Sequence, residues 1–361
     1  MQNVLITGGA GFIGSNFVLY LLATQPDVHL VNLDALTYAG CMQNLDNITD
    51  ENRYEFIKGS ILNQPLLDRI FQEHRIDTVV HFAAETHVDR SIYDPRIFLD
   101  TNITGTYTLL EAARNAWLDQ QWVPLQGCRF HQISTDEVYG TLAPNDPPFF
   151  EAQAYAPRSP YSASKASADH FVRAFGNTYG LPFTISNCSN NYGPRQYPEK
   201  LIPLIALNAV GGKTLPVYGD GLQIRDWIYV EDHCRAVLDI LTRGQPGSTY
   251  NIGGGNQPTN LEIVQHICSI LDELQPDPTN HSYADRIEFV IDRRGHDRRY
   301  AMDTSMIEIE LEWKPRETLD SGLRKTIQWY LEHPEWVAAV KMRPDYQEWI
   351  ALNYQERGGL A

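Results

Sequence analysis

The stretch "NVLITGGAGFIGSNF" at residues 3–17 joins a short β-branched run to a glycine-rich loop and an apolar run that continues to residue 24. The loop contains the spacing Gly9-x-Gly11-x-x-Gly14 and equally Gly8-x-x-Gly11-x-x-Gly14. Glycine permits a tight turn, a close approach of the backbone to a ligand, and close packing of a helix on a strand. The order of strand, glycine loop and helix is typical of a dinucleotide-binding unit, and a plain glycine-rich turn is the alternative.

The same alternation of short β-branched runs and longer amphipathic runs continues to about residue 190. It predicts an α/β fold of the Rossmann type, a doubly wound parallel sheet with helices on both faces. The expected strands are 3–9, 28–34, 54–60, 77–84, 128–134 and 183–190, and the expected helices include 14–24, 65–74 and 101–116.

After residue 190 the composition changes. Residues 191–230 are rich in Gly, Pro and Tyr and predict loops and short elements, whereas 261–274 predict a helix and 287–292 a strand. We therefore expect a Rossmann domain at 1–190, which also takes in about 228–258, and a smaller α/β substrate domain at 191–361.

Asp34 ends the second expected strand, 20 residues beyond Gly14. A carboxylate at this place can hold both hydroxyls of an adenosine ribose, and it repels the 2′-phosphate of NADP. The next residues, Ala35 to Thr37, include no arginine that could bind such a phosphate. The sequence therefore favours NAD as the cofactor.

The charge and the cysteines limit the class of protein. The 361-residue chain has a formal net charge of −16, which disfavours nucleic acid and anionic membranes as partners. Its five cysteines show no C-x-x-C pair and no metal-ligand spacing with histidine, so we expect reduced, core-filling thiols and no metal. No apolar run approaches the length of a membrane span and the N-terminus has no signal-peptide pattern, so we expect a cytoplasmic protein.

A second chemical pattern lies in "SPYSASKASADHFVRAF" at 159–175, which Ser159 and Pro160 open as a helix. Tyr161 and Lys165 are four residues apart and share a helix face. A nearby ammonium group lowers a tyrosine pKa from about 10, which would make Tyr161 a base for an alcohol proton. The similar pair in "YEFIK", at residues 54 and 58, lies on a strand, where four residues span about 13 Å.

The stretch "ISTDEVYG" at 133–140 ends an expected strand in two adjacent carboxylates, Asp136 and Glu137. Such a pair gains nothing in a core and is commonly a solvated turn. It can also be an acid and a base held side by side for proton transfer. Composition does not decide between the two.

The loop "TGGAGFIG", the serine–threonine strand end and "YSASK" resemble the extended short-chain dehydrogenase/reductase family. The longer motifs narrow the resemblance to the nucleotide-sugar 4,6-dehydratases of that family, with dTDP-glucose as the implied substrate. They are "DALTYAG" (34–40), "FAAETHVDRSI" (82–92), "STDEVYG" (134–140), "NNYGPRQYPEKLIP" (190–203), "LPVYGDGLQIRDWIYV" (215–230) and "GHDRRYA" (295–301). The resemblance extends from residue 1 to about 330. Departures are Ser60 for an acidic residue, Thr86 for serine and Arg294 for proline.

The resemblance implies a hydro-lyase that oxidises C4 of the sugar with NAD, eliminates water across C5 and C6, and returns the hydride to C6. Tyr161 would be the base at the C4 hydroxyl, Lys165 would lower its pKa and hold the nicotinamide ribose, and Thr135 would bind the C4 oxygen. Glu137 would take the C5 proton, and a protonated Asp136 would donate to the leaving oxygen. Repulsion between the two carboxyl groups raises one pKa, which suits an acid beside a base.

The resemblance also implies the ligand contacts. Those to NAD would come from Gly8, Gly11, Phe12, Ile13, Gly14, Asp34, Thr37, Ser60, Ile61, Phe82, Ala83, Ala84, Thr86, Thr101, Tyr161, Lys165 and Asn191. Those to the nucleotide sugar would come from Thr86, His87, Thr135, Asn190, Lys200, Leu201, Pro216, Tyr218, Arg225, Asn260, Arg293, His296 and Tyr300. For His81 and His131 we expect core or hydrogen-bonding roles.

Two other functions remain as alternatives. A nucleotide-sugar 4-epimerase shares the fold, NAD and the tyrosine–lysine pair, but needs no acid–base pair for elimination. An NAD-binding regulatory protein without catalysis would not need Thr135, Tyr161 and Lys165. The family resemblance further implies a homodimer, with helices such as 101–116 and 161–176 packing across a two-fold axis.

Overall fold

The structure is a computed structural model and describes residues 1–278, 281–292 and 295–355. Its centre is a seven-stranded sheet in the order β10-β6-β5-β4-β1-β2-β3, with every neighbouring pair parallel. The strands are β1 (Asn3–Thr7), β2 (His29–Asp34), β3 (Tyr54–Lys58), β4 (Thr78–His81), β5 (Arg129–Thr135), β6 (Phe183–Cys188) and β10 (Thr249–Ile252). The expected doubly wound sheet is confirmed, and the strand order reverses between β1 and β4, where such folds bind ligands.

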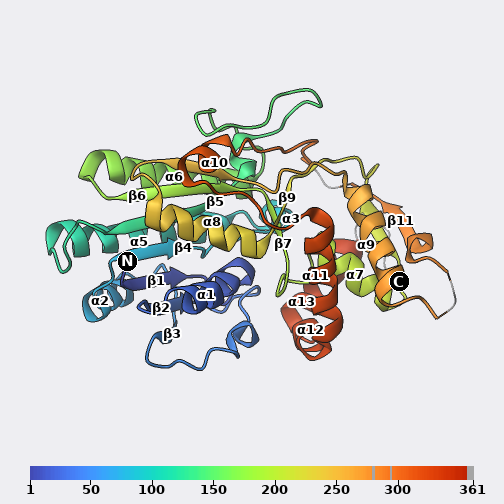
Figure 1. Cartoon of the computed structure of the whole chain (residues 1–361), viewed down its shortest axis with the longest axis horizontal. Coiled ribbons are helices and arrows are strands. Elements are labelled where there is room, and N and C mark those ends of the chain that lie inside the picture. Colours follow the sequence, from blue (N-terminus) through green and yellow to red (C-terminus); the bar gives the residue numbers. More distant parts are fainter. Residues whose placement is uncertain (279–280, 293–294, 356–361) are drawn as a thin grey trace.

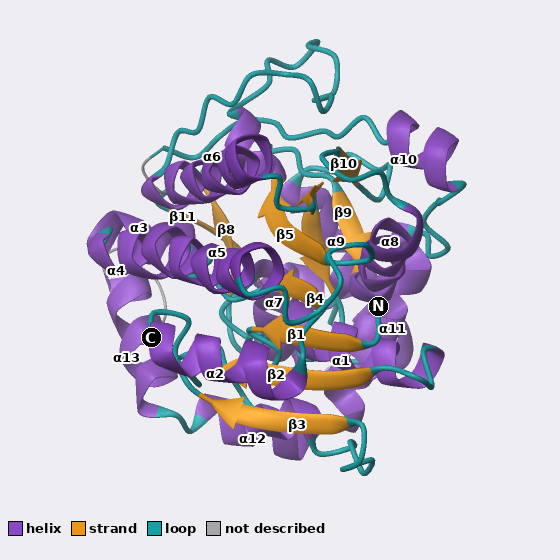
Figure 2. Ribbon diagram, turned by 90° about the vertical axis from the view of Figure 1, so that its left-hand side faces the viewer, coloured by secondary structure: helices purple, strands orange, loops and turns teal. Residues whose placement is uncertain are grey.

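Helices cover both faces of this sheet (Figures 1 and 2). One face carries α2 (Gln64–His74), α5 (Thr106–Arg114) and α6 (Pro160–Tyr179), and the other carries α1 (Phe12–Thr24) and α8 (Val230–Arg243). Alternate residues of one strand serve the two faces: Leu5 packs in the α2–α5–α6 cluster, and Val4 and Ile6 pack in the α1–α8 cluster. Because this strand is covered on both faces, it is apolar at successive positions.

A second layer packs beside the carboxyl ends of the strands (Figure 1). It contains the pairs β7–β9 (Asn190–Tyr192, Trp227–Tyr229) and β8–β11 (Leu215–Tyr218, Ile287–Val290), with α7 (Leu201–Val210), α9 (Asn260–Leu274) and α11 (Leu319–Glu332) around them. The composition of residues 191–230 predicts loops and short elements, and α7 is not among them. That helix is apolar on almost every side because it is enclosed by its neighbours, so it has no amphipathic period to detect.

The chain crosses between the layers more than once. Helix α8, yellow in Figure 1, and strand β10 return to the large sheet, and α10 (Ser305–Leu311) packs against β10. The division into a Rossmann domain at 1–190 with 228–258, and a substrate domain at 191–361, remains our proposal.

The other elements are short or local. They are η1 (Met42–Leu45), α3 (Val88–Tyr93), α4 (Arg96–Phe98), the π-helical η2 (Leu99–Gly105) and η3 (Asn115–Asp119) at the two ends of α5, η4 (Asp136–Tyr139), η5 (Tyr283–Arg286), α12 (Pro334–Lys341) and α13 (Pro344–Gln355). The helix expected over 101–116 is therefore a regular α-helix only over its middle part.

Replacing Phe130 with alanine should destabilise the protein by about 3–5 kcal/mol, because this fully buried ring of β5 fills the core below the strand that carries the carboxylates. The matched control Phe289→Ala removes a ring that is 56% exposed and should change stability by less than about 0.5 kcal/mol. Urea unfolding at a fixed NAD concentration measures both. Equal midpoints for the two variants would contradict the assignment of Phe130 to the core.

Candidate active site

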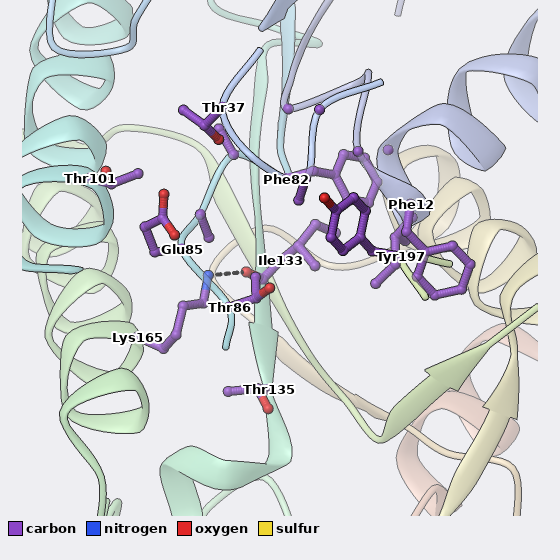
Figure 3. Close-up of a pocket in the computed structure, with 18 of the residues that line it drawn as sticks. Phe12, Thr37, Phe82, Glu85, Thr86, Thr101, Ile133, Thr135, Lys165 and Tyr197 are labelled. Carbon is purple, nitrogen blue, oxygen red and sulfur yellow. Dashed lines mark hydrogen bonds between the residues drawn. The ribbon is translucent and has the colours of Figure 1, made fainter. Parts of the chain in front are cut away.

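A cavity of ≈ 360 Å³ lies at the carboxyl edge of the large sheet, beside the β1–β4 reversal (Figure 3). All the residues expected to contact NAD line it: Gly8, Gly11, Phe12, Ile13, Gly14, Asp34, Thr37, Ser60, Ile61, Phe82, Ala83, Ala84, Thr86, Thr101, Tyr161, Lys165 and Asn191. The same cavity is lined by Thr135, Asp136 and Glu137. The glycine loop, the tyrosine–lysine helix and the acid pair thus share one space.

The glycine loop shapes the cofactor end of the cavity. A Cβ atom on Gly14 would lie 2.2 Å from the carbonyl oxygen of Gly8, so this glycine lets helix α1 pack on the loop. A Cβ atom on Gly11 would meet one atom within 4 Å, the same oxygen at 3.3 Å, and Gly11 borders the cavity. Helix α1 begins after Gly11 without a side-chain cap, so its first N–H groups are available to a phosphate.

Asp34 is held in place at the end of β2 by two backbone groups. Its Oδ2 accepts the Ala10 N–H at 2.9 Å and its Oδ1 accepts the Leu36 N–H at 2.7 Å. Burial raises the pKa of Asp34, and these two hydrogen bonds oppose the rise. Each carboxylate oxygen keeps a lone pair for a ribose hydroxyl. The site therefore fits NAD, which Gly11, the α1 N-terminus and Asp34 would hold.

The acid pair stands where β5 runs into η4. Thr135 fixes the turn, because its Oγ1 donates to Asp136 Oδ1 at 3.2 Å and accepts the Glu137 N–H at 3.3 Å. Burial raises the pKa of Asp136 well above its ordinary value, and the neighbouring charge of Glu137 raises it further. Within the described chain, Asp136 Oδ2 is buried and has no hydrogen-bond partner. Asp136 is thus suited to remain protonated.

Helix α6 places Tyr161 and Lys165 beside this turn. Ser159 caps the helix by accepting the Ser162 N–H at 3.0 Å, as the sequence predicted for its start. Both side chains are buried, and Lys165 Nζ donates to the carbonyl oxygen of Ile133 at 2.7 Å, the dashed line in Figure 3. The helix thereby ties its ammonium group to the strand that carries the acid pair.

One electrostatic expectation is wrong for this structure. Lys165 was expected to lower the pKa of Tyr161, but burial raises the Tyr161 pKa well above 10, and the charge of Glu137 adds to the rise. Burial also lowers the pKa of Lys165, while the charge of Asp169 opposes that change. The reason is that the ammonium group is directed to Ile133 and both groups are desolvated, which spacing along a helix does not reveal.

The expected nucleotide-sugar contacts divide into two groups. Thr86, Thr135, Asn190 and Lys200 line the cavity, whereas His87, Leu201, Pro216, Tyr218, Arg225, Asn260, His296 and Tyr300 do not. Arg225 nevertheless lies close enough to the acid pair for its charge to lower the pKa of Asp136. Its guanidinium lies 4.2 Å from the centre of the Tyr300 ring. Arg293 lies outside the described residues.

Sequence reasoning missed several residues of the cavity wall, including Tyr38, Glu85, Tyr197 and Glu199. Asn102, on the π-helical η2, holds the Glu85 backbone at both its N–H (2.8 Å) and its carbonyl oxygen (3.0 Å). Burial raises the pKa of Glu85 to about 7. Glu85 and Glu199 could have been predicted from the sequence, because they directly precede Thr86 and Lys200 in the motifs that resemble the family.

A second set of buried polar groups faces the core rather than the cavity. Burial lowers the pKa of His81 and of His131 to about 3, and both rings bond to threonine hydroxyls, as expected for core histidines.

All five cysteines are buried and none forms a disulfide. In the described parts of the chain no cluster of His, Cys, Asp and Glu could hold a metal, and every helix is too short or too polar to cross a bilayer.

The doubly wound sheet, the glycine loop and the buried tyrosine–lysine pair define the class, the extended short-chain dehydrogenases/reductases. A family model described as GDP-mannose 4,6 dehydratase matches residues 5–326. The chain is 53% identical over 364 residues to dTDP-glucose 4,6-dehydratase 1 of Escherichia coli (strain K12), with 99% of this chain and 100% of the relative covered. It is 56% identical over 334 residues to dTDP-glucose 4,6-dehydratase of Neisseria gonorrhoeae, with 92% and 96% covered.

A solved structure agrees with these relatives. The dTDP-glucose 4,6-dehydratase of Bacillus anthracis in complex with NAD matches with a TM-score of 0.83 and 44% identity, covering 94% of this chain and 100% of that one. The chain belongs to the dTDP-glucose 4,6-dehydratase family. The resemblance inferred from the motifs is confirmed.

The raised pKa of Glu85 predicts a pH-dependent cost to stability. The pKa of Glu85 is about 7 in the folded protein against an ordinary 4.5, so the folded state binds the proton more tightly than the unfolded chain does. The resulting stabilisation is fully present below pH 4.5 and is lost as the pH rises through 7. Glu85→Gln should therefore lose less stability than the unmodified protein between pH 5 and pH 8. Unfolding midpoints at the two pH values measure the difference.

The control for this prediction is Glu51→Gln, which changes an exposed carboxyl group outside the cavity. It should retain the pH dependence of the unmodified protein. An unchanged pH dependence in Glu85→Gln would show that Glu85 ionises without cost in the folded state.

Proposed function

We propose that this chain converts dTDP-glucose to dTDP-4-keto-6-deoxyglucose by NAD-dependent dehydration, a hydro-lyase reaction whose product feeds deoxysugar or rhamnose synthesis. The observation that carries the proposal is the position of Asp136 and Glu137. They line the same cavity as Tyr161, Lys165 and the NAD-fitting glycine loop. That position supports acid–base work rather than a solvated turn.

The order of the reaction follows from the acidity of the sugar. The C5 proton is not acidic until C4 is oxidised to a ketone, after which it lies α to a carbonyl and the C6 hydroxyl lies β to it. NAD supplies the hydride acceptor at C4 and returns the hydride at C6. Tyr161 takes the proton of the C4 hydroxyl, and Lys165, whose ammonium group donates to the Ile133 carbonyl oxygen, holds the nicotinamide ribose. Thr135 binds the C4 oxygen.

The elimination uses the two carboxyl groups in opposite protonation states. Glu137 takes the proton from C5, and Asp136, which burial keeps protonated, donates to the leaving C6 oxygen. Like charges that cannot both ionise side by side force this division of roles. Each proton transfer contributes about 10²–10⁴-fold to the rate.

The remaining site assignments belong to the same proposal. The cavity-lining residues predicted for NAD hold the cofactor, and Thr86, Asn190 and Lys200 meet the nucleotide sugar. His87 borders the substrate, and the residues that bind the nucleotide part are Leu201, Pro216, Tyr218, Arg225, Asn260, Arg293, His296 and Tyr300. A cytoplasmic location is supported by five buried cysteines that form no disulfide.

The alternatives are less well supported. A 4-epimerase oxidises and re-reduces the same carbon and has no use for an acid beside a base at a second carbon. Relatives of this chain at 53% and 56% identity are named as dehydratases. A regulatory protein without catalysis would not need a buried tyrosine and lysine beside the acid pair.

A homodimer is the finer part of the proposal. Apolar side chains stand exposed on the outer face of α4, η2, α5 and α6: Ile97, Leu99, Tyr107, Phe171 and Tyr179 are 39–50% exposed. The rings of Tyr107 and Phe171 lie 6.1 Å apart, which joins the two helices into one patch. Packing this patch against its copy across a two-fold axis would bury it.

Asp136→Asn should lower the rate of water loss by about 10²–10⁴-fold, because an amide cannot donate the proton to the leaving oxygen. Mass spectrometry measures it: dehydration removes the mass of one water, whereas epimerisation leaves the mass unchanged. With substrate deuterated at C4, the product of the unmodified enzyme should carry the label at C6. The exposed Asp27→Asn serves as the control. Product without the C6 label would refute the internal return of hydride.

Phe171→Glu should convert the dimer to a monomer, since it places a charge in the apolar patch of α5 and α6. Light scattering after gel filtration gives the mass directly. Phe289→Glu changes a more exposed ring on β11, outside the patch, and should leave the mass unchanged. A monomeric unmodified protein would contradict the dimer.

A further inference from the structure

We propose that Trp336 and Arg343, on the C-terminal segment 334–355, are positioning residues that hold the loop 35–45 closed over bound NAD. The inference deepens the proposed function, because a cofactor that takes a hydride from C4 and gives it to C6 must stay bound between the two transfers. The segment comprises α12 and α13, which lie far from the glycine loop in sequence and on the side of the blue helix α1 that faces away from β1–β3 in Figure 1.

The loop forms one wall of the cofactor end of the cavity. Thr37, Tyr38, Ala39 and Gly40 all line the cavity, directly after Asp34. A nucleotide held by the Asp34 carboxylate therefore lies against this loop. Release of the cofactor requires the loop to move, so whatever fixes the loop slows release.

Arg343 fixes the middle of the loop. Its guanidinium donates to the Gly40 carbonyl oxygen at 2.8 Å and to the Thr37 carbonyl oxygen at 3.2 Å. It follows α12 and opens the turn into α13, and it also pairs with Asp345 at 3.3 Å. Two backbone carbonyls three residues apart are thus held by one side chain from near the C-terminal end of the chain.

Trp336 fixes the far end of the loop and reaches the glycine loop through one residue. Its indole N–H donates to Asn44 Oδ1 at 2.8 Å, and Asn44 Nδ2 donates to the Ala10 carbonyl oxygen at 2.9 Å. Trp336 and Asn44 are buried. Two hydrogen bonds in series therefore connect α12, through Asn44 of η1, to the glycine loop.

Aromatic side chains also pack between α13 and the loop 35–45. The Tyr346 ring of α13 lies 5.8 Å from Tyr197, which lies 5.9 Å from Tyr38 in the loop. Arg90 lies between the loop and α13, with its guanidinium 3.9 Å from the Tyr38 ring and 4.4 Å from the Trp349 ring. Tyr38 and Tyr197 also line the cavity, so this packing reaches the ligand space.

The test measures the dissociation of NAD from the full-length protein in the absence of sugar nucleotide. Protein loaded with NAD is diluted, and the bound NAD is quantified after gel filtration at successive times. Arg343→Ala removes two hydrogen bonds and should release NAD about tenfold faster than the unmodified protein. Trp336→Phe keeps an aromatic ring but removes the indole N–H, and should release NAD about threefold faster. Arg343→Lys retains a cationic donor and should release NAD at an intermediate rate.

The matched control is Arg324→Ala on α11, an arginine that pairs with Glu273 and Asp320 and has no contact with the loop. It should release NAD within twofold of the unmodified rate. Release at the unmodified rate by both Arg343→Ala and Trp336→Phe, or equal acceleration by Arg324→Ala, would overturn the proposal. If Arg343→Ala does not fold, Trp336→Phe decides alone. Because no sugar is present, failure of the proposed dehydration would leave this result interpretable.

Discussion

The parallel direction of the central strands is the constraint on which the site depends. Because β1, β2, β4, β5 and β6 all run the same way, their carboxyl ends meet at one edge, and residues distant in sequence become neighbours. In the register of β1 and β4, Thr7 pairs with His81, and the Thr7 hydroxyl forms a hydrogen bond of 2.7 Å with the His81 ring. The glycine loop and the acid pair occupy the first positions after β1 and β5, and Asp34 is the last residue of β2. Their convergence follows from the topology.

Burial then sets the chemistry at that edge. Water is excluded from Asp34, Asp136 and Tyr161, and removal of water raises the pKa of each group. The free-energy cost of this burial reduces stability, and only at Asp136 does the raised pKa suit a group proposed to hold a proton. Glu137 increases the pKa shift at both Asp136 and Tyr161, so these two groups are coupled through one charge. Asp136 and Tyr161 are therefore not independent of each other, because the same neighbouring charge raises the pKa of both.

The sequence predicted the sheet and its flanking helices because these depend on local patterns, and the family resemblance implied most residues of the cavity wall. The β-branched runs, the glycine spacing and the Ser159 cap are read within a few residues, and the structure confirms them. What could not be read depends on packing between distant segments. Helix α7 lacks a polar face because its neighbours enclose it, and the Lys165 ammonium is bound by Ile133, a strand residue whose distance from the helix no spacing encodes. The roles of the individual site residues remain predictions.

The C-terminal helices illustrate the same limit and give it a functional meaning. Nothing in residues 334–355 carries a cofactor motif, and the motif resemblance ended at about residue 330. Their connection to the cofactor exists only in three dimensions, through backbone carbonyls at Thr37 and Gly40 and a buried asparagine. Backbone acceptors place no demand on the identity of the loop residues, so the loop sequence cannot reveal the contact. A reaction that borrows a hydride and returns it needs retention as much as it needs acid and base. Under the two proposals, residues 135–165 in the middle of the chain would supply the acid and the base, and residues 336 and 343 near its C-terminal end would supply the retention.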